Sequence, residues 1–423
     1  MLPIVYGVGT CLLLWVTCLH PALSFEHKWV AKDSVSVEDI NEDFHQIFTG
    51  YKDHVDHFRF LLEEGNFMLI GGRNKVYNIS LMTFKEDEDR RLTWKPKVSD
   101  ENLCNSKSDP KYQSKCQNFI QVLGKIDDGK IYVCGTNAFK PKCRSYEYKE
   151  ANYPIQIPEY VSNHEELGTG KSPHDPEHNS TSIYTGGKLY SATSADFLGR
   201  DPLIMMSENQ IILRTAQHDS NMLSEPHFVS SIEIDDMIYI FMRENAVENI
   251  NCGKATFSRV ARVCKQDKGG QYEDGVWTSY FKARLNCSLP GDIPFPFNEL
   301  HATSSFSQGN YMPTKDNHNR TQMFYGVFNT PDNSIQGSAV CAYVFDDVHK
   351  AFEGPFKGQR TAQHNWLRYP LDQTPSPHPA QHCVNDSKTL PDDTLKFIRE
   401  HPLMDTAIAP SGGTPILIQT GMQ

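Results

Sequence analysis

Asp128-Gly129-Lys130-Ile131-Tyr132-Val133-Cys134-Gly135 is a polar turn that leads into a short apolar strand with a tyrosine in it. Four further stretches have this shape: Gly65–Gly71, Gly186–Ser191, Asp235–Phe241 and Gln322–Phe328. Four of the five stretches carry the tyrosine, and these tyrosines are 58, 49 and 86 positions apart. A loose period of about 50 to 60 residues with one insertion favours an all-β propeller of four-stranded blades, with a β-sandwich as the alternative.

The N-terminus indicates the secretory pathway. Residues 1–24 contain no Asp, Glu, Lys or Arg, and an apolar run from Val8 to Leu19 is followed by small residues at Ala22 and Ser24. This pattern predicts a signal peptide over 1–24 that is cleaved before Phe25, and the run is short for an uncleaved membrane anchor. We therefore expect the protein, as given, to be secreted and extracellular.

Composition excludes some classes of partner. The net charge of -11 is unlike the positive charge of a nucleic-acid-binding protein or of a protein that binds an anionic membrane face. The mean hydropathy of -0.51 indicates a polar chain. No stretch after the signal peptide is apolar enough to span a bilayer. About 400 mature residues suffice for a large core.

The cysteines favour disulfides over metal. Nine follow the signal peptide: Cys104, Cys116, Cys134, Cys143, Cys252, Cys264, Cys287, Cys341 and Cys383. They form no CxxC pair and no Cys-His spacing typical of zinc. Proximity favours Cys104–Cys116 and Cys134–Cys143 as short loops, while spacing alone leaves the other pairings open. Because nine is odd, at least one thiol is free or bonded to another chain.

Five sequons predict N-glycans on exposed loops. They begin at Asn78, Asn179, Asn286, Asn319 and Asn385.

No catalytic constellation is present, so we predict that the chain is not an enzyme and needs no cofactor, metal or small-molecule substrate. The sequence has no G-x-S-x-G and no phosphate-binding loop. His174-Asp175-Pro176-Glu177-His178 groups metal-ligand types, but its prolines favour a surface loop. A glycan-processing, sialidase-like propeller enzyme stays open as an alternative.

Asp392–Glu400 predicts a short helix with Asp392 or Asp393 as its N-cap.

Several long motifs resemble the sema domain of semaphorins, most closely the invertebrate class 1 members. They include CQNFIQVLGKIDDGKIYVCGTNAFKPKC (116–143), GKLYSATSADFLGRDPLI (187–204), FMRENAVENINCGKATFSRVARVCKQDKGG (241–270), GVFNTPDNSIQGSAVCAY (326–343) and CVNDSKTLPDDTLKFIREHPLMDTAI (383–408). The resemblance runs from Val55 to the end, so residues 25–54 lead into a domain at 55–423. It implies a seven-bladed propeller that binds and dimerises plexin receptors as a cue in axon guidance and cell migration.

The family's pattern continues beyond Gln423. The resemblance therefore leads us to expect a sema domain that lacks roughly its last one and a half blades, as a fragment or a naturally shortened form. A full-length parent would be secreted or membrane-anchored. A shortened form that competes as a non-signalling decoy is the alternative function.

The resemblance also implies residue roles. The disulfides it implies are Cys104–Cys116, Cys134–Cys143, Cys264–Cys383 and Cys287–Cys341. Cys252 is then left as a free thiol or as an interchain link in a homodimer. Receptor contacts are implied in two segments, at Arg214, Gln217, His218, Asp219 and Asn221 and at Arg399, His401 and Met404. Burial of Leu403 and Met404 in the core is the alternative for the second segment.

Overall fold

The computed structural model describes residues 48–51, 53–127, 130–150, 156–160, 165–208, 211–271, 275–309, 321–361 and 363–420. The predicted signal peptide (1–24), most of the segment 25–54 and the sequon asparagine Asn319 lie outside the described residues.

The described residues form five antiparallel sheets of four or five strands each. The first three sheets contain β1 (Arg59–Glu64), β2 (Phe67–Gly72), β3 (Lys75–Ser80) and β4 (Leu92–Thr93); β5 (Ile120–Asp127), β6 (Lys130–Gly135), β7 (Lys142–Glu150), β8 (Gln156–Tyr160) and β9 (Glu166–Leu167); and β10 (Thr181–Thr185), β11 (Lys188–Ser194), β12 (Pro202–Glu208) and β13 (Ile211–Arg214). The last two contain β14 (His227–Ile234), β15 (Met237–Asn245), β16 (Thr256–Cys264) and β17 (Phe281–Leu285); and β20 (Glu299–Thr303), β21 (Ser307–Gly309), β22 (Thr321–Asn329), β23 (Gly337–Val344) and β26 (Leu417–Thr420).

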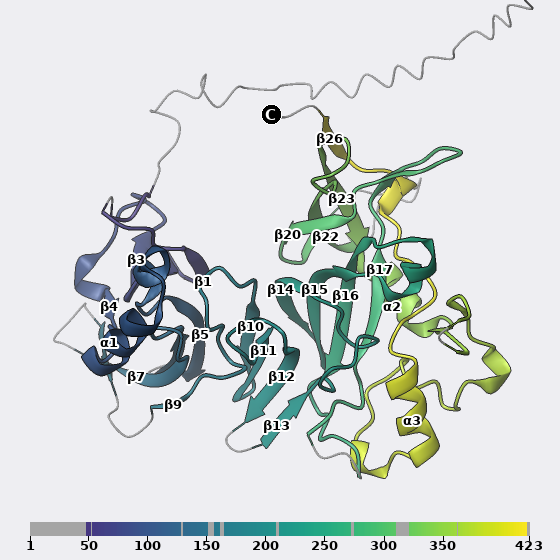
Figure 1. Cartoon of the computed structure of the whole chain (residues 1–423), viewed down its shortest axis with the longest axis horizontal. Coiled ribbons are helices and arrows are strands. Elements are labelled where there is room, and N and C mark those ends of the chain that lie inside the picture. The colour runs from purple at the N-terminus through teal and green to yellow at the C-terminus, as the bar shows by residue number, and fades with distance from the viewer. Residues whose placement is uncertain are drawn as a thin grey trace, which may run out of the picture.

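The five sheets are arranged as propeller blades (Figure 1). The first strand of each sheet contacts the first strand of the next, in the order β1, β5, β10, β14 and β20. Each of the five sequence repeats forms the second strand of its sheet: β2, β6, β11, β15 and β22. Turns with positive φ, at Gly186 and Asp235 for example, connect the first two strands of a sheet as tight hairpins. The all-β propeller is thus confirmed, and the count of seven blades stays a prediction.

The fifth sheet carries a long insertion between β23 and β26. It contains α2 (Phe345–Glu353), the strand pair β24 (Lys357–Gly358) and β25 (Leu367–Arg368), and α3 (Asp392–Glu400). The predicted helix 392–400 is confirmed with the same bounds. Its N-cap is Pro391 without a side-chain cap, so the expected cap at Asp392 or Asp393 was wrong. These two carboxylates lie in the first turn, where they interact favourably with the helix dipole.

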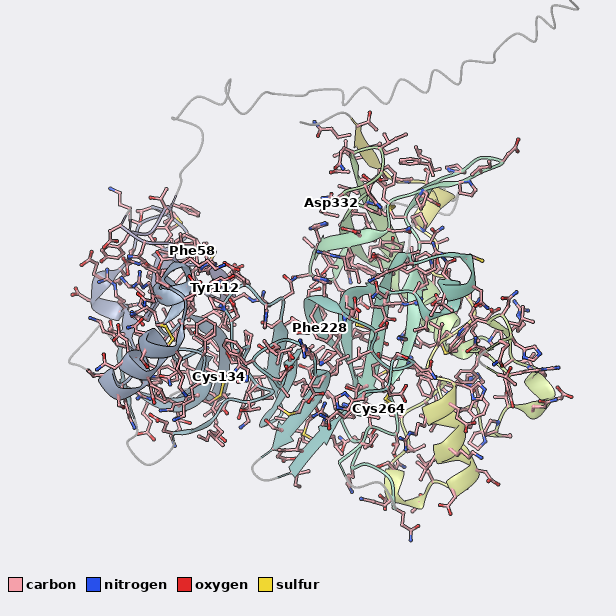
Figure 2. The ribbon with its side chains drawn as sticks, viewed as in Figure 1. Phe58, Tyr112, Cys134, Phe228, Cys264 and Asp332 are labelled. Atoms are coloured by element: carbon pink, nitrogen blue, oxygen red, sulfur yellow. A yellow bond between two sulfur atoms is a disulfide. The ribbon has the colours of Figure 1, made fainter. Side chains whose placement is uncertain are left out.

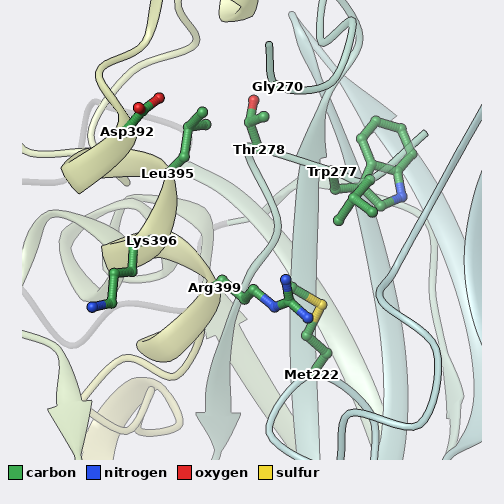
Figure 3. Close-up of a pocket in the computed structure, with 9 residues that line it drawn as sticks. Met222, Gly270, Trp277, Thr278, Asp392, Leu395, Lys396 and Arg399 are labelled. Atoms are coloured by element: carbon green, nitrogen blue, oxygen red, sulfur yellow. The ribbon is translucent and has the colours of Figure 1, made fainter. Parts of the chain in front are cut away.

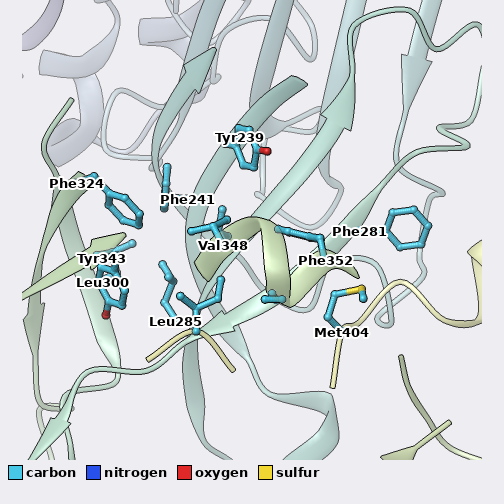
Figure 4. Close-up of a cluster of buried hydrophobic side chains, with 14 of the residues drawn as sticks. Tyr239, Phe241, Phe281, Leu285, Leu300, Phe324, Tyr343, Val348, Phe352 and Met404 are labelled. Carbon is cyan, nitrogen blue, oxygen red and sulfur yellow. The ribbon is translucent and has the colours of Figure 1, made fainter. Parts of the chain in front are cut away.

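The insertion packs against the fourth sheet. Residues 402–408 run parallel to β17, with bridges between Lys282 and Leu403 and between Leu285 and Ile408. The largest hydrophobic cluster lies between β15, β17, the fifth sheet and α2, and it includes Phe241, Phe324 and Phe352 (Figure 4). Burial of this aromatic cluster fixes the insertion, and with it α3, against the fourth blade.

Two further elements lie outside the blades: α1 (Val98–Lys107) and the pair β18 (Ser288–Leu289) and β19 (Phe295–Pro296). Four disulfides join Cys104–Cys116, Cys134–Cys143, Cys264–Cys383 and Cys287–Cys341, the same pairs that the resemblance implies (Figure 2). Cys264–Cys383 links the end of β16 to the insertion, which adds a covalent restraint to the packing described above.

Candidate functional site

The two predicted receptor segments lie at one edge of the molecule, although about 180 residues separate them. The first begins at the end of β13 and the second at the end of α3, and both elements lie in the same lower region of Figure 1. A pocket of about 390 Å³ lies between Met222, directly after the first segment, and Arg399 of the second. Its lining residues are Met222, Gly270, Val276, Trp277, Thr278, Asp392, Leu395, Lys396 and Arg399. Figure 3 shows the Arg399 side chain directed from α3 toward Met222, the buried residue that directly follows the first segment.

In the first segment, Asp201 organises two of the predicted contact residues. Arg214 forms an ion pair with Asp201 at 2.6 Å, and the Gln217 side chain donates to the same carboxylate at 3.1 Å. His218 is exposed and has a φ of 59°. Asp219 accepts the Asn221 backbone N–H at 2.9 Å. Among the predicted contact residues of this turn, Gln217 and His218 are therefore the exposed ones, whereas Arg214 and Asp219 hold its shape.

Lys282 connects the two segments physically. Its ammonium Nζ donates to the carbonyl oxygen of Met222 at 2.8 Å. Its backbone N–H donates to the carbonyl of Pro402, and its own carbonyl accepts from the Met404 N–H, both at 2.8 Å. Lys282 is fully buried. A single residue of β17 therefore binds Met222, directly after the first segment, and residues 402–404, shortly after α3.

A buried cluster of charges stabilises this arrangement. It consists of Glu244, Glu248, Arg259 and Lys282, two acids and two bases. Lys282 Nζ and Arg259 Nε both bind Glu244 Oε1, at 2.5 and 3.0 Å. Burial lowers the pKa of Lys282, and the charge of Glu244 opposes this effect. Because opposite charges balance within the cluster, all four can stay ionised in the protein interior.

The same cluster fixes a short 3-10 helix, η5 (Val247–Cys252). Arg259 binds both carboxylate oxygens of Glu248, at 2.7 and 2.6 Å. Burial by itself would raise the pKa of Glu248, but Arg259 outweighs it, so the pKa lies below its usual value. Cys252, at the end of η5, is exposed, and it is the free cysteine of the described part of the chain. The cluster thus contacts η5, which ends at this thiol, as well as the backbone next to the two predicted receptor segments.

The second segment divides into surface and core. Arg399 is exposed, and His401 is half-buried, stacked on Phe397 with ring centroids 4.4 Å apart. Burial lowers the pKa of His401. Met404 has only 2% of its surface exposed and belongs to the largest hydrophobic cluster. Its prediction as a receptor contact was therefore wrong, because the parallel pairing with β17 turns the side chain into the core.

Phe197 and Leu198 extend this surface and were missed from the sequence. They are 54% and 60% exposed and lie in the loop between β11 and β12 that leads to Asp201. Since Asp201 binds Arg214 and Gln217, this loop borders the first segment. The apolar pair before Gly199 can be read in the sequence, but its exposure is known only from the tertiary structure.

The sequon asparagines differ in their surroundings. Asn179 and Asn385 are exposed, whereas Asn78, within β3, and Asn286 are half-buried. Asn286 donates to the hydroxyl of Ser288 at 3.2 Å.

Among the residues with described positions, no three His, Cys, Asp or Glu side chains are grouped so that they could hold a metal ion. A helix long and apolar enough to cross a membrane is likewise not found among them.

Comparisons with known proteins agree on one family. A model of the Sema domain matches residues 308–423. Semaphorin-1A of Schistocerca americana is 47% identical over 98% of this chain and 54% of its own length. The solved structure of Drosophila Semaphorin 1b, extracellular domains 1-2, is 40% identical with a TM-score of 0.77, covering 87% of this chain and 67% of that one. The structure of Drosophila Plexin A in complex with Semaphorin 1b matches with the same values. The chain spans about half the length of the curated relatives it matches.

Proposed function

The chain belongs to the semaphorin family, with class 1 members among its relatives, and we propose that it is an extracellular guidance ligand that binds and dimerises a plexin receptor. The observation that carries this proposal is the likeness to Semaphorin 1b, whose structure was solved in complex with Plexin A. Axon guidance and cell migration are the processes we assign to it. On this proposal the protein is a binding module and not an enzyme.

We assign plexin binding to the surface formed by Phe197, Leu198, Gln217, His218 and Arg399. These side chains are exposed, and they combine two large apolar groups with a guanidinium and an imidazole. Interfaces draw most of their binding energy from a few such anchors surrounded by polar groups. The ion pair of Asp201 with Arg214 and the buried charge cluster hold the backbone of this surface in place, which reduces the entropy cost of binding.

We assign dimerisation to the face that contains η5. Cys252 is exposed there, and Ile250, two residues before it, is 66% exposed. In a two-fold symmetric dimer one residue can meet its own copy, so Cys252 can form a disulfide with Cys252 of a second chain. A covalent dimer would present two receptor surfaces at once, which raises the effective affinity for clustered plexins.

Secretion through a cleaved signal peptide, with N-glycans at the five sequons, completes the proposal. Four disulfides in the described chain fit an oxidising compartment. N-terminal sequencing of protein collected from the medium of expressing cells tests it. Phe25 as the first residue is expected, and a protein that stays in the cell with Met1 intact contradicts it.

Plexin binding is tested with the extracellular region of Drosophila Plexin A immobilised on a sensor surface. Saturable binding of the purified chain is expected, with no binding to an unrelated receptor ectodomain on the reference channel. Absence of binding by correctly folded protein, or equal binding to both channels, contradicts the proposal.

A further inference from the structure

A second pocket, of about 260 Å³, lies on the third and fourth blades. Its walls include His178 and Asn179 before β10, Thr193 on β11, Leu198 and Gly199 in the following loop, and His227 on β14. Pockets for drug-sized ligands have volumes of roughly 300–1,000 Å³, so this one is suited to a smaller group such as a single sugar ring.

Two polar atoms in the pocket walls are buried without a hydrogen-bond partner in the protein: Thr193 Oγ1 and His178 Nδ1. Thr193 as a whole is only 2% exposed. A buried hydroxyl without a partner is unfavourable, and native proteins rarely leave one so. Both atoms belong to residues that line the pocket, and a ligand with donors and acceptors could satisfy them after a small shift of these side chains.

Asn179, the first residue of the sequon Asn179-Ser180-Thr181, lies in the same wall. Its side chain is exposed, and Nδ2 lies 3.0 Å from Nδ1 of His227. Because the amide nitrogen is a donor, His227 Nδ1 is the acceptor and the ring is neutral. Partial desolvation and the nearby Arg243 guanidinium lower the pKa of His227, which keeps the ring neutral at physiological pH. The hydrogen bond thus fixes the atom that would carry a glycan.

We propose that the first N-acetylglucosamine of an N-glycan on Asn179 binds in this pocket. In the transfer reaction, a lipid diphosphate-linked oligosaccharide is the donor: the sugar–phosphate bond breaks, a bond from the sugar C1 to Nδ2 forms, and one Nδ2 proton is lost. The remaining Nδ2 hydrogen can still be donated to His227. The acetamido group and ring hydroxyls then supply partners for Thr193 Oγ1 and His178 Nδ1.

The bound sugar would connect the two blades beside Leu198. The sugar would therefore be held in one position at the edge of the assigned plexin surface, and would not move freely as an exposed glycan does. This inference rests on the proposed glycosylation and not on plexin binding itself.

Peptide N-glycanase, which cuts the Asn–sugar bond, tests the proposal on the intact secreted protein. Site-resolved mass spectrometry follows release from each sequon under native conditions, and Asn385, exposed in a loop, is the internal control. Two hydrogen bonds to the first sugar predict release from Asn179 about tenfold slower than from Asn385. After denaturation the two rates should be equal.

Thr193→Val keeps the shape of the side chain and removes its hydroxyl. In this variant the glycan should be released from Asn179 under native conditions about fivefold faster than in the parent protein, whereas Thr193→Ser should keep the slow release. Equal native rates at the two sites, or protection unchanged in Thr193→Val, overturn the inference. An unmodified Asn179 in a chain glycosylated elsewhere overturns it too, and leaves secretion standing. If no sequon is modified, both the inference and the secretory proposal fail.

Discussion

Lys282 Nζ lies 2.5 Å from Glu244 Oε1, and neither side chain is exposed to solvent. The backbone of Lys282 pairs with the segment after α3, and the side chain reaches the carbonyl of Met222. Lys282 thus contacts two stretches that are distant in sequence, and its ion pair with Glu244 holds its side chain in place. We therefore propose that Lys282 helps to keep the assigned receptor surface rigid.

Replacement of Lys282 by Met should lower the free energy of unfolding by about 3–5 kcal/mol, because Glu244 is left as a buried carboxylate with one cationic partner fewer. Chemical denaturation followed by circular dichroism measures this. The double variant Lys282→Met/Glu244→Gln should be less destabilised than the sum of the single variants, since the carboxylate charge is then gone. Strict additivity would show that the two side chains do not interact.

Met404→Ala should affect stability, whereas Arg399→Ala should affect plexin binding. The first should cost about 2–5 kcal/mol of stability, because it opens a cavity in the largest core cluster. The second should change stability by no more than about 0.5 kcal/mol and weaken plexin binding instead. Thermal unfolding and sensor-surface binding, measured on both variants, separate the roles. A stable Met404→Ala protein with reduced binding would restore Met404 as a contact residue.

The local parts of this architecture could be predicted from the sequence. Each repeated apolar stretch forms the second strand of one blade, and the bounds of α3 follow from Pro391 and the His401-Pro402 pair that enclose it. The burial of Met404 could not be predicted in this way. It depends on parallel pairing with β17, which lies over 100 residues earlier in the chain.

The candidate surface was only partly predictable for the same reason. Sequence resemblance indicated the turn at Gln217 and His218. The ion pair of Asp201 with Arg214 and the pocket beside Arg399 arise instead from tertiary contacts. The exposure of Phe197 and Leu198 depends on the neighbouring blades, because the sequence of a turn does not fix which of its side chains face solvent.

Acid should weaken the second blade through Glu165. This carboxylate binds Lys142 at 3.0 Å and Arg144 at 2.8 Å. Burial would raise its pKa, but hydrogen bonds from Lys142 and Arg144 lower it to about 2, against 4.5 for the free side chain. Its folded-state pKa is depressed, so its contribution is present above pH 4.5 and is lost as the pH falls toward 2.

Glu165→Gln should therefore be less stable than the parent protein at pH 7, and the difference should shrink toward zero near pH 2. Urea denaturation across this pH range measures it. A difference that is constant with pH would contradict the assigned role of the charge.

Cys252→Ser should abolish a covalent dimer. Non-reducing gel electrophoresis of the secreted protein should show the parent at twice the monomer mass and the variant at the monomer mass. Both should migrate as monomers under reducing conditions. A dimer band that persists in Cys252→Ser would assign the interchain bond to another cysteine.

Charge reversal at Arg399 tests the central claim most directly. Plexin A binding is compared for the parent, Arg399→Asp and the control Lys107→Asp, an exposed lysine at the end of α1, on the opposite side in Figure 1. We predict that Arg399→Asp weakens binding at least about tenfold, as expected for loss of an interface anchor, while the affinity of Lys107→Asp is unchanged. Both variants place an acid in the last turn of a helix, so both should stay folded with a similar small loss of stability. Unchanged affinity in a folded Arg399→Asp protein, or equal loss of affinity in both variants, would contradict the assignment of this surface.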